Sequence, residues 1–268
     1  MFKVICVKAL GIDVGSQNVK AVILDGTGPL VSAIVPAGEG SEATAKLAMD
    51  EVFIKAGLTP EGCYVVATGV GSKAVTFSQT QKSMTTCLAR GVNLLFPSAR
   101  MAIDLGAETS TVLKINERGR VTDWAGQDKC AAGTGMFLQA MAKIMQVDLN
   151  SMAELSLLAP KRADISGTCA VFAESEVISH IHRVPPTPKE EIIAGIHASM
   201  VSRIIGLLKR LTIEREIAVT GGVARNKGLI DILEKELGFK VLVPENPEMV
   251  AALGAAVLAK ENIEKGTK

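Results

Sequence analysis

An internal repeat is the sequence feature that most constrains how this chain folds. The segment LGIDVGSQNVKAVILDG, residues 10–26, aligns with MAIDLGAETSTVLKINERG, residues 101–119. Three turn positions correspond between the copies, namely Asp13 with Asp104, Gly15 with Gly106, and Gln17 with Glu108. Each copy is an apolar run ending in Asp, a turn with Gly and a second alternating run, a pattern typical of a β-hairpin. The repeat therefore predicts two similar structural units.

The segments that follow the two hairpins extend this pattern. After the first hairpin we expect a strand at Leu30–Val35, a helix at Glu42–Ala56 and a buried strand at Tyr64–Thr68. After the second we expect a strand at Gly119–Trp124, helices directly after Cys130 (Ala131–Gln146) and Cys169 (Ala170–His180), a long helix at Lys189–Leu211, a strand at Ile217–Thr220, a helix to Leu237, a strand at Lys240–Val243 and a final helix. The sequence predicts an α/β fold with two lobes, residues 1–98 and 99–268, and a cleft between them. We expect the final helix to pack back on the first lobe.

Composition limits the classes of partner. Aromatic residues make up only 3% of the 268 residues, which argues against binding nucleic acid by base stacking. The formal net charge of +1 predicts no attraction to nucleic acid or to an anionic membrane. No apolar run approaches the ~20 residues that span a bilayer, and Lys3 and Lys8 interrupt the apolar N-terminal run. We expect a soluble cytoplasmic protein that binds neither nucleic acid nor membrane.

The two matched turns predict a phosphate clamp for Mg·ATP. Backbone N–H groups of a turn with Gly can approach phosphate oxygens without a Cβ in the way. Asp13 and Asp104 end their strands, where a carboxylate can position Mg²⁺ and the attacking water, and Glu108 is a candidate to orient that water. The candidate phosphate-binding residues are Gly11, Asp13, Gly15, Ser16, Gln17 and Lys20 in the first copy, Asp104, Gly106, Ala107 and Glu108 in the second, and Gly133, Thr134 and Gly135 in a later turn.

A second pair of glycines suits adenosine. It lies in TGGVARNKG, residues 220–228, after the strand expected at Ile217–Thr220. Without side chains, Gly221 and Gly222 let a base lie flat on the backbone. The candidate adenosine-binding residues are Gly221, Gly222, Val223 and Asn226, with Glu248 on the adenine side.

These are the phosphate and adenosine motifs of the actin-like ATPase superfamily, and two stretches with cysteine narrow the resemblance. The stretches are DKCAAGTGMFLQAMA at residues 128–142 and GTCAVFAESEVISHI at residues 167–181. Over essentially the whole chain, the sequence resembles the activator ATPases (component A) of 2-hydroxyacyl-CoA dehydratases and the related ATPase subunits of benzoyl-CoA reductase. The resemblance implies two similar actin-like (ribonuclease-H-like) lobes.

The resemblance also implies a cofactor and partners. In that family a homodimer holds one [4Fe–4S] cluster with two cysteines from each subunit, which implicates Cys130 and Cys169 here. ATP hydrolysis is then implied to drive one low-potential electron into a partner iron–sulfur enzyme. That partner is a 2-hydroxyacyl-CoA dehydratase, a benzoyl-CoA reductase or a double-cubane cluster protein, and ferredoxin or flavodoxin is the implied reductant.

The residues around the cysteines agree with this assignment. Cys130 and Cys169 each precede a helix-forming run, and a positive helix end stabilises a thiolate. A cubane needs about four thiolates, so a two-fold axis through the cluster is the simplest arrangement. Such a cluster is accessible to solvent and therefore sensitive to oxygen. The other three cysteines, Cys6, Cys63 and Cys87, are expected to be small core residues.

Some positions depart from the family's usual pattern, and two other classes of function stay open. Ala107 and Glu108 replace Gly and Gln in the second phosphate motif, and Met136 stands where Arg is usual. A small-molecule kinase of the same fold is one alternative, although we find no general-base Asp beyond the phosphate motif of the first lobe. A non-catalytic nucleotide or redox sensor is the other. An iron assay separates activator from kinase, and an ATPase assay separates activator from sensor.

Overall fold

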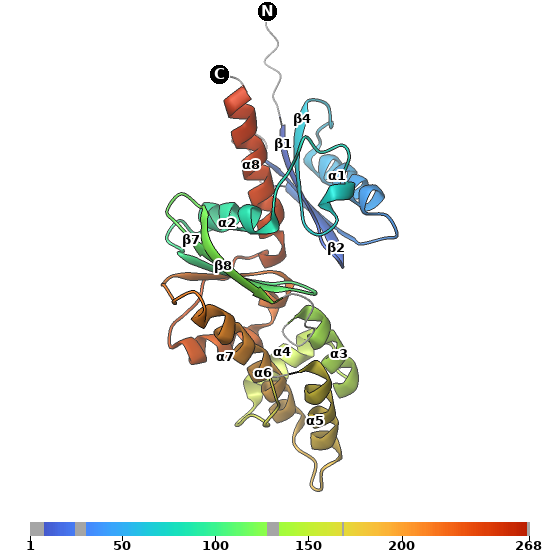
Figure 1. Ribbon diagram of the computed structural model, residues 1–268. Coiled ribbons are helices and arrows are strands. Elements are labelled where there is room, and N and C mark those ends of the chain that lie inside the picture. The colour runs from blue at the N-terminus through green and yellow to red at the C-terminus, as the bar shows by residue number, and fades with distance from the viewer. Residues whose placement is uncertain (1–7, 25–30, 128–133, 168, 267–268) are drawn as a thin grey trace, which may run out of the picture. The chain divides into compact units, whose positions relative to one another are not determined.

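The chain forms two compact units, each built on its own sheet (Figure 1). The computed structural model describes residues 8–24, 31–127, 134–167 and 169–266. The first unit comprises Met1–Ser98, Ile115–Val121 and Met249–Lys268, and the second comprises Ala99–Lys114 and Thr122–Glu248.

The first unit contains a five-stranded sheet in the order β3-β2-β1-β4-β5. Its strands are β1 (Lys8–Val14), β2 (Asn18–Leu24), β3 (Val31–Pro36), β4 (Cys63–Thr68) and β5 (Thr80–Gln81). β1 pairs antiparallel with β2 and parallel with β4. The first predicted hairpin and the predicted buried strand after it are thus confirmed.

Helices cover both faces of this sheet (Figure 1). Helix α1 (Ser41–Ala56) packs on one face, while α2 (Met84–Leu95) and α8 (Val250–Gly266) pack on the other. Successive residues of a strand point to opposite faces, so Leu10 of β1 joins the cluster with Phe53 of α1, whereas Ala9 joins the cluster with Ala255 of α8. The final helix therefore belongs to the core of the first unit.

Glycines allow unusually close packing on the α8 side. A Cβ on Gly11 of β1 would lie 2.0 Å from the carbonyl oxygen of Ala252, so the strand meets the backbone of α8 directly. A Cβ on Gly254 of α8 would lie 1.7 Å from the carbonyl oxygen of Cys87 in α2. No side chain larger than hydrogen fits at either contact. Gly11, predicted to contact phosphate, therefore has a packing role in this unit.

The second unit contains a four-stranded sheet in the order β8-β7-β6-β9. Its strands are β6 (Met101–Leu105), β7 (Ser110–Ile115), β8 (Val121–Gln127) and β9 (Ile217–Thr220). β6 pairs antiparallel with β7 and parallel with β9, which confirms the second hairpin.

The strand predicted at Lys240–Val243 was wrong. Within the described residues, this segment makes a single bridge, between Ala218 and Leu242. The N–H of Val241 donates to the carboxylate of Glu234 at 3.0 Å, and Pro244, which follows the segment, has no N–H to donate. The ladder therefore cannot extend in either direction.

In the described part of the second unit, five α-helices accompany the sheet. They are α3 (Gly135–Met145), α4 (Leu149–Leu158), α5 (Ala170–His182), α6 (Lys189–Lys209) and α7 (Lys227–Leu237). α6 packs against α4, α5 and α7 and forms the middle of the core. By length and composition α6 could also cross a membrane, but 72% of its apolar window is buried inside the protein, as expected for a core helix.

Two helix boundaries in this unit differ from the sequence prediction. The helix expected to begin at Ala131 begins at Gly135, because Thr134 is extended and the turn after β6 provides the first acceptors. Helix α4 was not predicted. It exists because Gln146 ends α3 in a left-handed conformation with φ 54°, and because the Asp148 carboxylate accepts N–H bonds from the first turn of α4.

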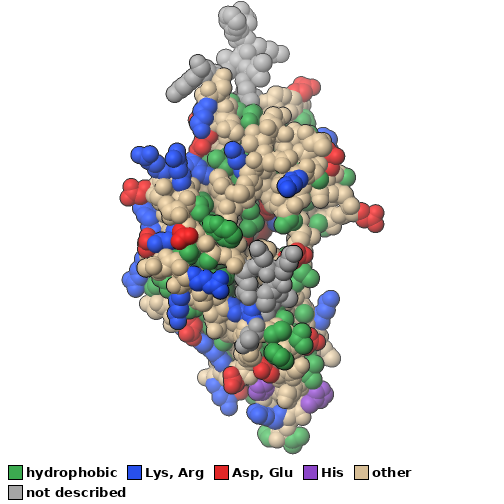
Figure 2. Space-filling view, in the orientation of Figure 1, with side chains coloured by type: hydrophobic (Ala, Val, Ile, Leu, Met, Phe, Trp, Pro, Cys, Tyr) green, Lys and Arg blue, Asp and Glu red, His purple; other side chains and the backbone are tan. Residues whose placement is uncertain are grey.

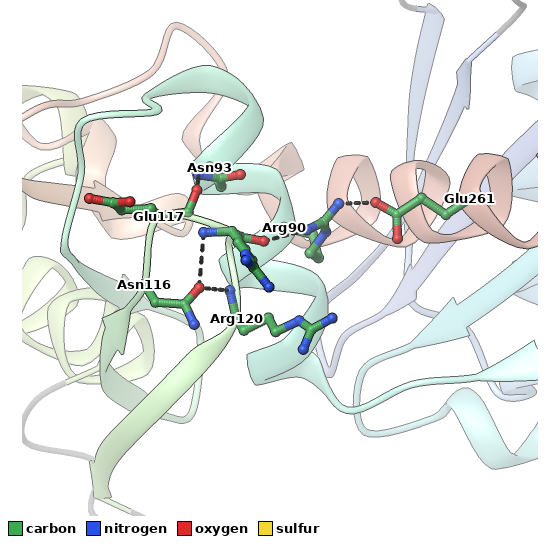
Figure 3. A network of polar contacts seen from close by, with 7 residues as sticks. Arg90, Asn93, Asn116, Glu117, Arg120 and Glu261 are labelled. Carbon is green, nitrogen blue, oxygen red and sulfur yellow. Dashed lines mark hydrogen bonds and ion pairs between the residues drawn. The ribbon is translucent and has the colours of Figure 1, made fainter.

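The turn between β7 and β8 belongs to the first unit, and Figure 3 shows its contacts. Arg90 of α2 forms an ion pair with Glu261 of α8 and donates to the carbonyl oxygen of Arg118 at 2.6 Å. The turn is closed internally by Asn116, whose Oδ1 accepts the N–H groups of Arg118 and Arg120. These contacts join the turn at residues 116–120 to α2, whose Arg90 is also paired with α8.

Candidate nucleotide and cluster site

The first repeat turn holds a buried carboxylate beside a lysine. Asp13 lies near the end of β1 and is only 6% exposed. Lys20 is its cross-strand partner on β2, and its Nζ lies 3.1 Å from Asp13 Oδ2. The turn between them is closed by the Gly15 N–H, which donates to the carbonyl oxygen of Asn18 at 3.1 Å. A carboxylate and an ammonium group therefore meet at the end of this strand pair.

A glycine that sequence reasoning missed lies against the same carboxylate. A Cβ on Gly69 would lie 2.5 Å from Asp13 Oδ1, and the residue has φ +89°. Gly71, two residues on, donates its N–H to the carbonyl oxygen of Val14 at 3.1 Å. The available signal was the sequence Thr68-Gly69 directly after β4, because β4 runs parallel to β1 and the carboxyl ends of parallel strands meet.

The second repeat turn holds its carboxylate differently. Asp104 lies on β6, and its Oδ1 is 3.0 Å from the hydroxyl of Thr220, the neighbouring residue on parallel strand β9. The turn itself repeats the first, since the Gly106 N–H donates to the carbonyl oxygen of Thr109 at 2.9 Å. Thr220 was not predicted as a site residue, although it is the first residue of TGGVARNKG.

The second turn also binds the start of α3. The N–H of Gly135 donates to the carbonyl oxygen of Gly106, and the N–H of Met136 donates to that of Ala107, both at 2.9 Å. A Cβ on Gly135 would lie 3.4 Å from Ala107 Cα and 3.3 Å from Val223 Cγ2. The structure thus brings together predicted phosphate and adenosine residues from three separate stretches.

The remaining residues of the predicted phosphate set differ in their surroundings. Thr134 is buried and Glu108 is exposed at the tip of the second turn. Ser16 is exposed and Gln17 is half-buried at the first turn. Gly133 lies outside the described residues.

The glycine pair after β9 has one constrained and one open member. Gly221 has φ 85°, and a Cβ there would lie 2.3 Å from the carbonyl oxygen of Leu105, so this position requires glycine. A Cβ on Gly222 would have no neighbour within 4 Å. Gly222 begins a 3-10 helix, Gly222–Arg225, that leads to α7. The open side of Gly222 is where a flat ligand could contact the backbone.

Charged side chains border the backbone at Gly221 and Gly222, which we call the adenosine ledge. Arg225 Nε donates to Glu248 at 2.8 Å, and a second nitrogen of the same guanidinium contacts the other carboxylate oxygen. The hydrogen bond to Glu248 raises the pKa of Arg225. Glu248 was predicted on the adenine side, whereas Arg225 was not predicted. A groove of about 470 Å³ extends from here along α7, and Ala224, Arg225 and Pro247 are among its lining residues.

Asn226 has a structural role on the inner side of the ledge. It caps α7, because its Oδ1 accepts the Leu229 N–H at 3.0 Å. Its amide nitrogen lies 3.1 Å from Nε2 of His197 in α6. Both ends of this side chain are therefore engaged inside the second unit.

Cys169 occupies the N-cap position of α5, as predicted. Its backbone is extended, with φ −145° and ψ 142°, and its carbonyl oxygen accepts the Ala173 N–H at 3.0 Å. Cys169 is half-buried, and Val171 and Phe172, two and three residues further along the chain, are 66% and 61% exposed. Figure 2 shows hydrophobic side chains at the surface in this part of the second unit. Cys130 lies outside the described residues.

Two cysteines of the first unit, Cys63 and Cys87, have a different environment, and Cys6 lies outside the described residues. Burial raises the pKa of Cys63 to about 11 and that of Cys87 to about 12, so both are neutral thiols near pH 7. A metal–sulfur bond needs a thiolate. A half-exposed thiol at a helix N-terminus, such as Cys169, suits an iron–sulfur ligand better than either. No group of three or more potential metal ligands comes together within the described residues.

Comparison with known proteins places these features in a family. The model of the BadF/BadG/BcrA/BcrD ATPase family matches residues 10–259. An activator of lactoyl-CoA dehydratase from Anaerotignum propionicum is 41% identical, over 96% of this chain and 98% of that protein. The (R)-2-hydroxyglutaryl-CoA dehydratase activating ATPase of Acidaminococcus fermentans is 40% identical, over 96% and 98%.

Solved structures identify the fold. The activator of 2-hydroxyisocaproyl-CoA dehydratase from Clostridium difficile, solved with bound ADPNP, has a TM-score of 0.90 at 37% identity and covers 97% of each chain. A ROK family glucokinase from Streptomyces griseus has a TM-score of 0.57 at 12% identity, over 95% of this chain and 99% of that chain, and shows a shared fold only. The predicted actin-like α/β fold is confirmed.

Proposed function

Because the chain belongs to the BadF/BadG/BcrA/BcrD ATPase family, we propose that it is an activator ATPase that uses ATP hydrolysis to drive one electron into a partner iron–sulfur enzyme. The observation that carries the proposal is that both copies of the repeat keep a carboxylate at the end of a strand, each at a turn closed by a Gly N–H. Duplicated turns of this kind suit a nucleotide whose phosphates need N–H donors and a cation.

The proposed hydrolysis uses in-line attack of water on the γ-phosphate. Asp13 and Asp104 would hold Mg²⁺ and water, and bound Mg²⁺ neutralises charge on the phosphate oxygens. Lys20 lies next to Asp13 and offers an ammonium group to the phosphates. Glu108 is exposed at the tip of the second turn, where it is free to orient the water. Ser16, Gln17, Ala107 and the turn at residues 133–134 would supply N–H donors, while Gly15, Gly106 and Gly135, whose own N–H groups close the turns and join α3, would let the phosphates approach the backbone.

The adenosine is proposed to lie on the ledge formed by Gly221 and Gly222, with Val223 beside it. The open space next to Gly222 supports this assignment. Glu248 is held in place by Arg225, and this fixed pair would border the base. Asn226 would act from behind the ledge, because both ends of its side chain are already engaged.

The proposed electron-transfer site uses Cys130 and Cys169 from each of two subunits. When bound, a [4Fe–4S] cluster supplies one low-potential electron. Cys169 is the N-cap residue of α5, so its sulfur would bind the cluster next to the N–H groups of the first helical turn. Exposed Val171 and Phe172, together with Met136 at the start of α3, give this region the apolar surface that a subunit interface buries. We therefore propose a homodimer joined at the cluster.

The partner is proposed to be an iron–sulfur dehydratase that acts on a 2-hydroxyacyl-CoA. The named relatives at 40% and 41% identity are activators of such dehydratases, which supports this choice over a reductase. A ferredoxin or flavodoxin would reduce the protein in the cytoplasm.

The test is an anaerobic preparation with three measurements on the same sample. We expect a dimer by light scattering, about four irons for two chains, and reduction of a purified dehydratase only in the presence of ATP. A protein that hydrolyses ATP but contains no iron would not be an activator of this kind. That result would favour the alternative of a small-molecule kinase. A protein with iron but no ATP turnover would be a sensor.

A further inference from the structure

His197 on α6 is completely buried, and the proposed chemistry makes no use of it. Its Nε2 lies 3.1 Å from the amide nitrogen of Asn226, and its Nδ1 is buried without a hydrogen-bond partner among the described residues. Burial lowers the pKa of the imidazole to about 3, so the ring is neutral near pH 7. If Nε2 of the neutral ring accepts a hydrogen bond from the Asn226 amide N–H, the ring's single proton must be on Nδ1.

On one face of α6, this hydrogen bond reaches the adenosine ledge. Asn226 caps α7 and directly follows the 3-10 helix Gly222–Arg225. If the His197 bond is lost, the buried Asn226 side chain still caps α7 through its Oδ1 but loses the hydrogen bond that its amide nitrogen makes to α6. This pair thus joins α6 to the N-terminus of α7, four residues after Gly222.

On the opposite face, α6 carries the segment that leads to Cys169. A Cβ on Gly195 would lie 2.4 Å from the carbonyl oxygen of Ala163, and a Cβ on Gly167 would lie 3.1 Å from that of Ser199. Gly195 and Ser199 are one turn apart, and His197 projects about 180° away from them on a helix of 3.6 residues per turn. Residues 163–167 therefore follow the α6 face that points away from the ledge.

The same segment is fixed to α5. The Ser166 N–H donates to the carboxylate of Glu176 in α5, the helix that Cys169 caps. The Ala163 N–H donates to the carbonyl oxygen of Glu191 in α6 at 2.9 Å. A shift of α6 must therefore move the approach to Cys169, because both ends of the segment are bonded.

We propose that His197 is a positioning residue that transmits the nucleotide state from the adenosine ledge through α6 to Cys169. The inference rests on the proposed function, since it requires a nucleotide at the ledge and a functional thiolate at Cys169. The hydrogen bond to Asn226 is the joint on the nucleotide side. The packing of residues 163–167 on α6 is the joint on the cysteine side.

The test compares two variants of the full-length protein prepared anaerobically. His197→Gln keeps an acceptor at the reach of Nε2, whereas His197→Leu has similar size and no acceptor. Met200→Leu, a buried position on the same helix, is the matched control. Two rates are measured with ADP and with a non-hydrolysable ATP analogue: iron release to a chelator, and alkylation of Cys169 followed by mass spectrometry. Nucleotide affinity is measured separately with a fluorescent analogue.

In the wild type we expect the two nucleotides to change these rates by about fivefold or more relative to each other. His197→Leu should bring the ratio close to one while the nucleotide still binds, and His197→Gln and Met200→Leu should keep most of it. A wild-type ratio in His197→Leu overturns the proposal, as does a ratio of one in the wild type. If His197→Leu does not fold, His197→Asn, whose amide is too short to reach Asn226, takes its place against His197→Gln. Absence of iron would defeat the proposed function, but the alkylation ratio would still decide the role of His197.

Discussion

The two copies of the repeat have the same turn but support their carboxylates in different ways. In the first unit, Asp13 is buried against an ammonium group, that of Lys20. In the second, Asp104 meets a neutral hydroxyl, that of Thr220, and the turn beside it also caps α3 through Gly106 and Ala107. The first copy places an ammonium group beside its carboxylate, whereas the second is bonded to α3, the helix that follows Cys130 in the sequence. Duplication preserved the backbone geometry while the side-chain partners diverged.

The described cysteines of the two units also differ in how far their thiols are buried. Cys63 and Cys87 in the first unit are buried neutral thiols, and Cys169 in the second is half-exposed at a helix start. The thiols of Cys63 and Cys87 in the first unit therefore serve packing, whereas both proposed redox ligands belong to the second unit. The predictions below test this division, from the largest expected effect to the smallest.

Replacing Cys169 should abolish iron binding. Cys169→Ser removes one of the two proposed ligands in each subunit, so the dimer would keep only half of the four thiolates that a cubane needs. Iron content measured after anaerobic purification should fall to background. Cys63→Ser is the matched control from the first unit and should keep its iron, because its thiol is protonated near pH 7. Full iron content in Cys169→Ser would remove the division between the units.

Both carboxylates should be needed for ATP turnover. Asp13→Asn or Asp104→Asn keeps the size and some of the hydrogen bonds of the side chain but removes the charge that we propose to position Mg²⁺ and water. We expect each change to lower the turnover rate by about a hundredfold or more, measured as phosphate release at saturating ATP. Iron content should be unaffected. If only one variant loses activity, the two copies are not equivalent partners in a clamp.

Acid should destabilise the second unit selectively, because the fully buried His197 lies in it. Burial lowers the folded-state pKa of His197 to about 3, below the value of about 6.5 expected in the unfolded chain. Between these values the unfolded state binds the extra proton, so stability falls as the pH falls below about 6.5, by about 1.4 kcal/mol for each pH unit. Hydrogen exchange at pH 7 and pH 5 should show faster opening of α6 and α7 than of α1.

The matched variant for this pH effect is His197→Gln, which has no titrating group at the site. Its α6 and α7 amides should lose much less protection between pH 7 and pH 5 than those of the wild type. An equal loss in both proteins would assign the acid sensitivity to other groups.

Much of this division was visible in the sequence, because it depends on local pattern. The two hairpins, α1 and α7 follow from periodicity, and Asp13 and Asp104 follow from the repeat. The residues that contact these carboxylates are distant in the sequence, so no local pattern predicts them. Thr220 bonds to Asp104 from the neighbouring parallel strand, and Gly69, 56 residues after Asp13, lies against its carboxylate. The same holds for the absent strand at residues 240–243, where one side chain, Glu234, takes the N–H that a ladder would use.

Lys20 and Thr220 should contribute unequally to nucleotide binding. Lys20→Met removes a charged donor beside the phosphates, and we expect ATP affinity to weaken by about tenfold. Thr220→Val keeps the shape and removes a neutral hydroxyl, so the affinity should weaken by only about threefold. Titration with a fluorescent ATP analogue measures both. Equal losses would mean that the two carboxylates are supported equivalently despite their different partners.

The smallest effect should come from the contact between the second turn and α3. Gly135→Ala adds a Cβ 3.3 Å from Val223 Cγ2 and 3.4 Å from Ala107 Cα, which is tight enough to shift α3 slightly away from the turn. Gly206→Ala on α6 is the matched control, because a Cβ there meets nothing within 4 Å. Since the first turn has no such helix attached, only the second copy can pass a nucleotide-dependent displacement to the segment that precedes Thr134. We expect Gly135→Ala to reduce the effect of an ATP analogue on iron release by about threefold while the iron content stays the same. If Gly135→Ala and Gly206→Ala behave alike, the α3 contact is structural only, and α6 would be left as the route between nucleotide and cluster.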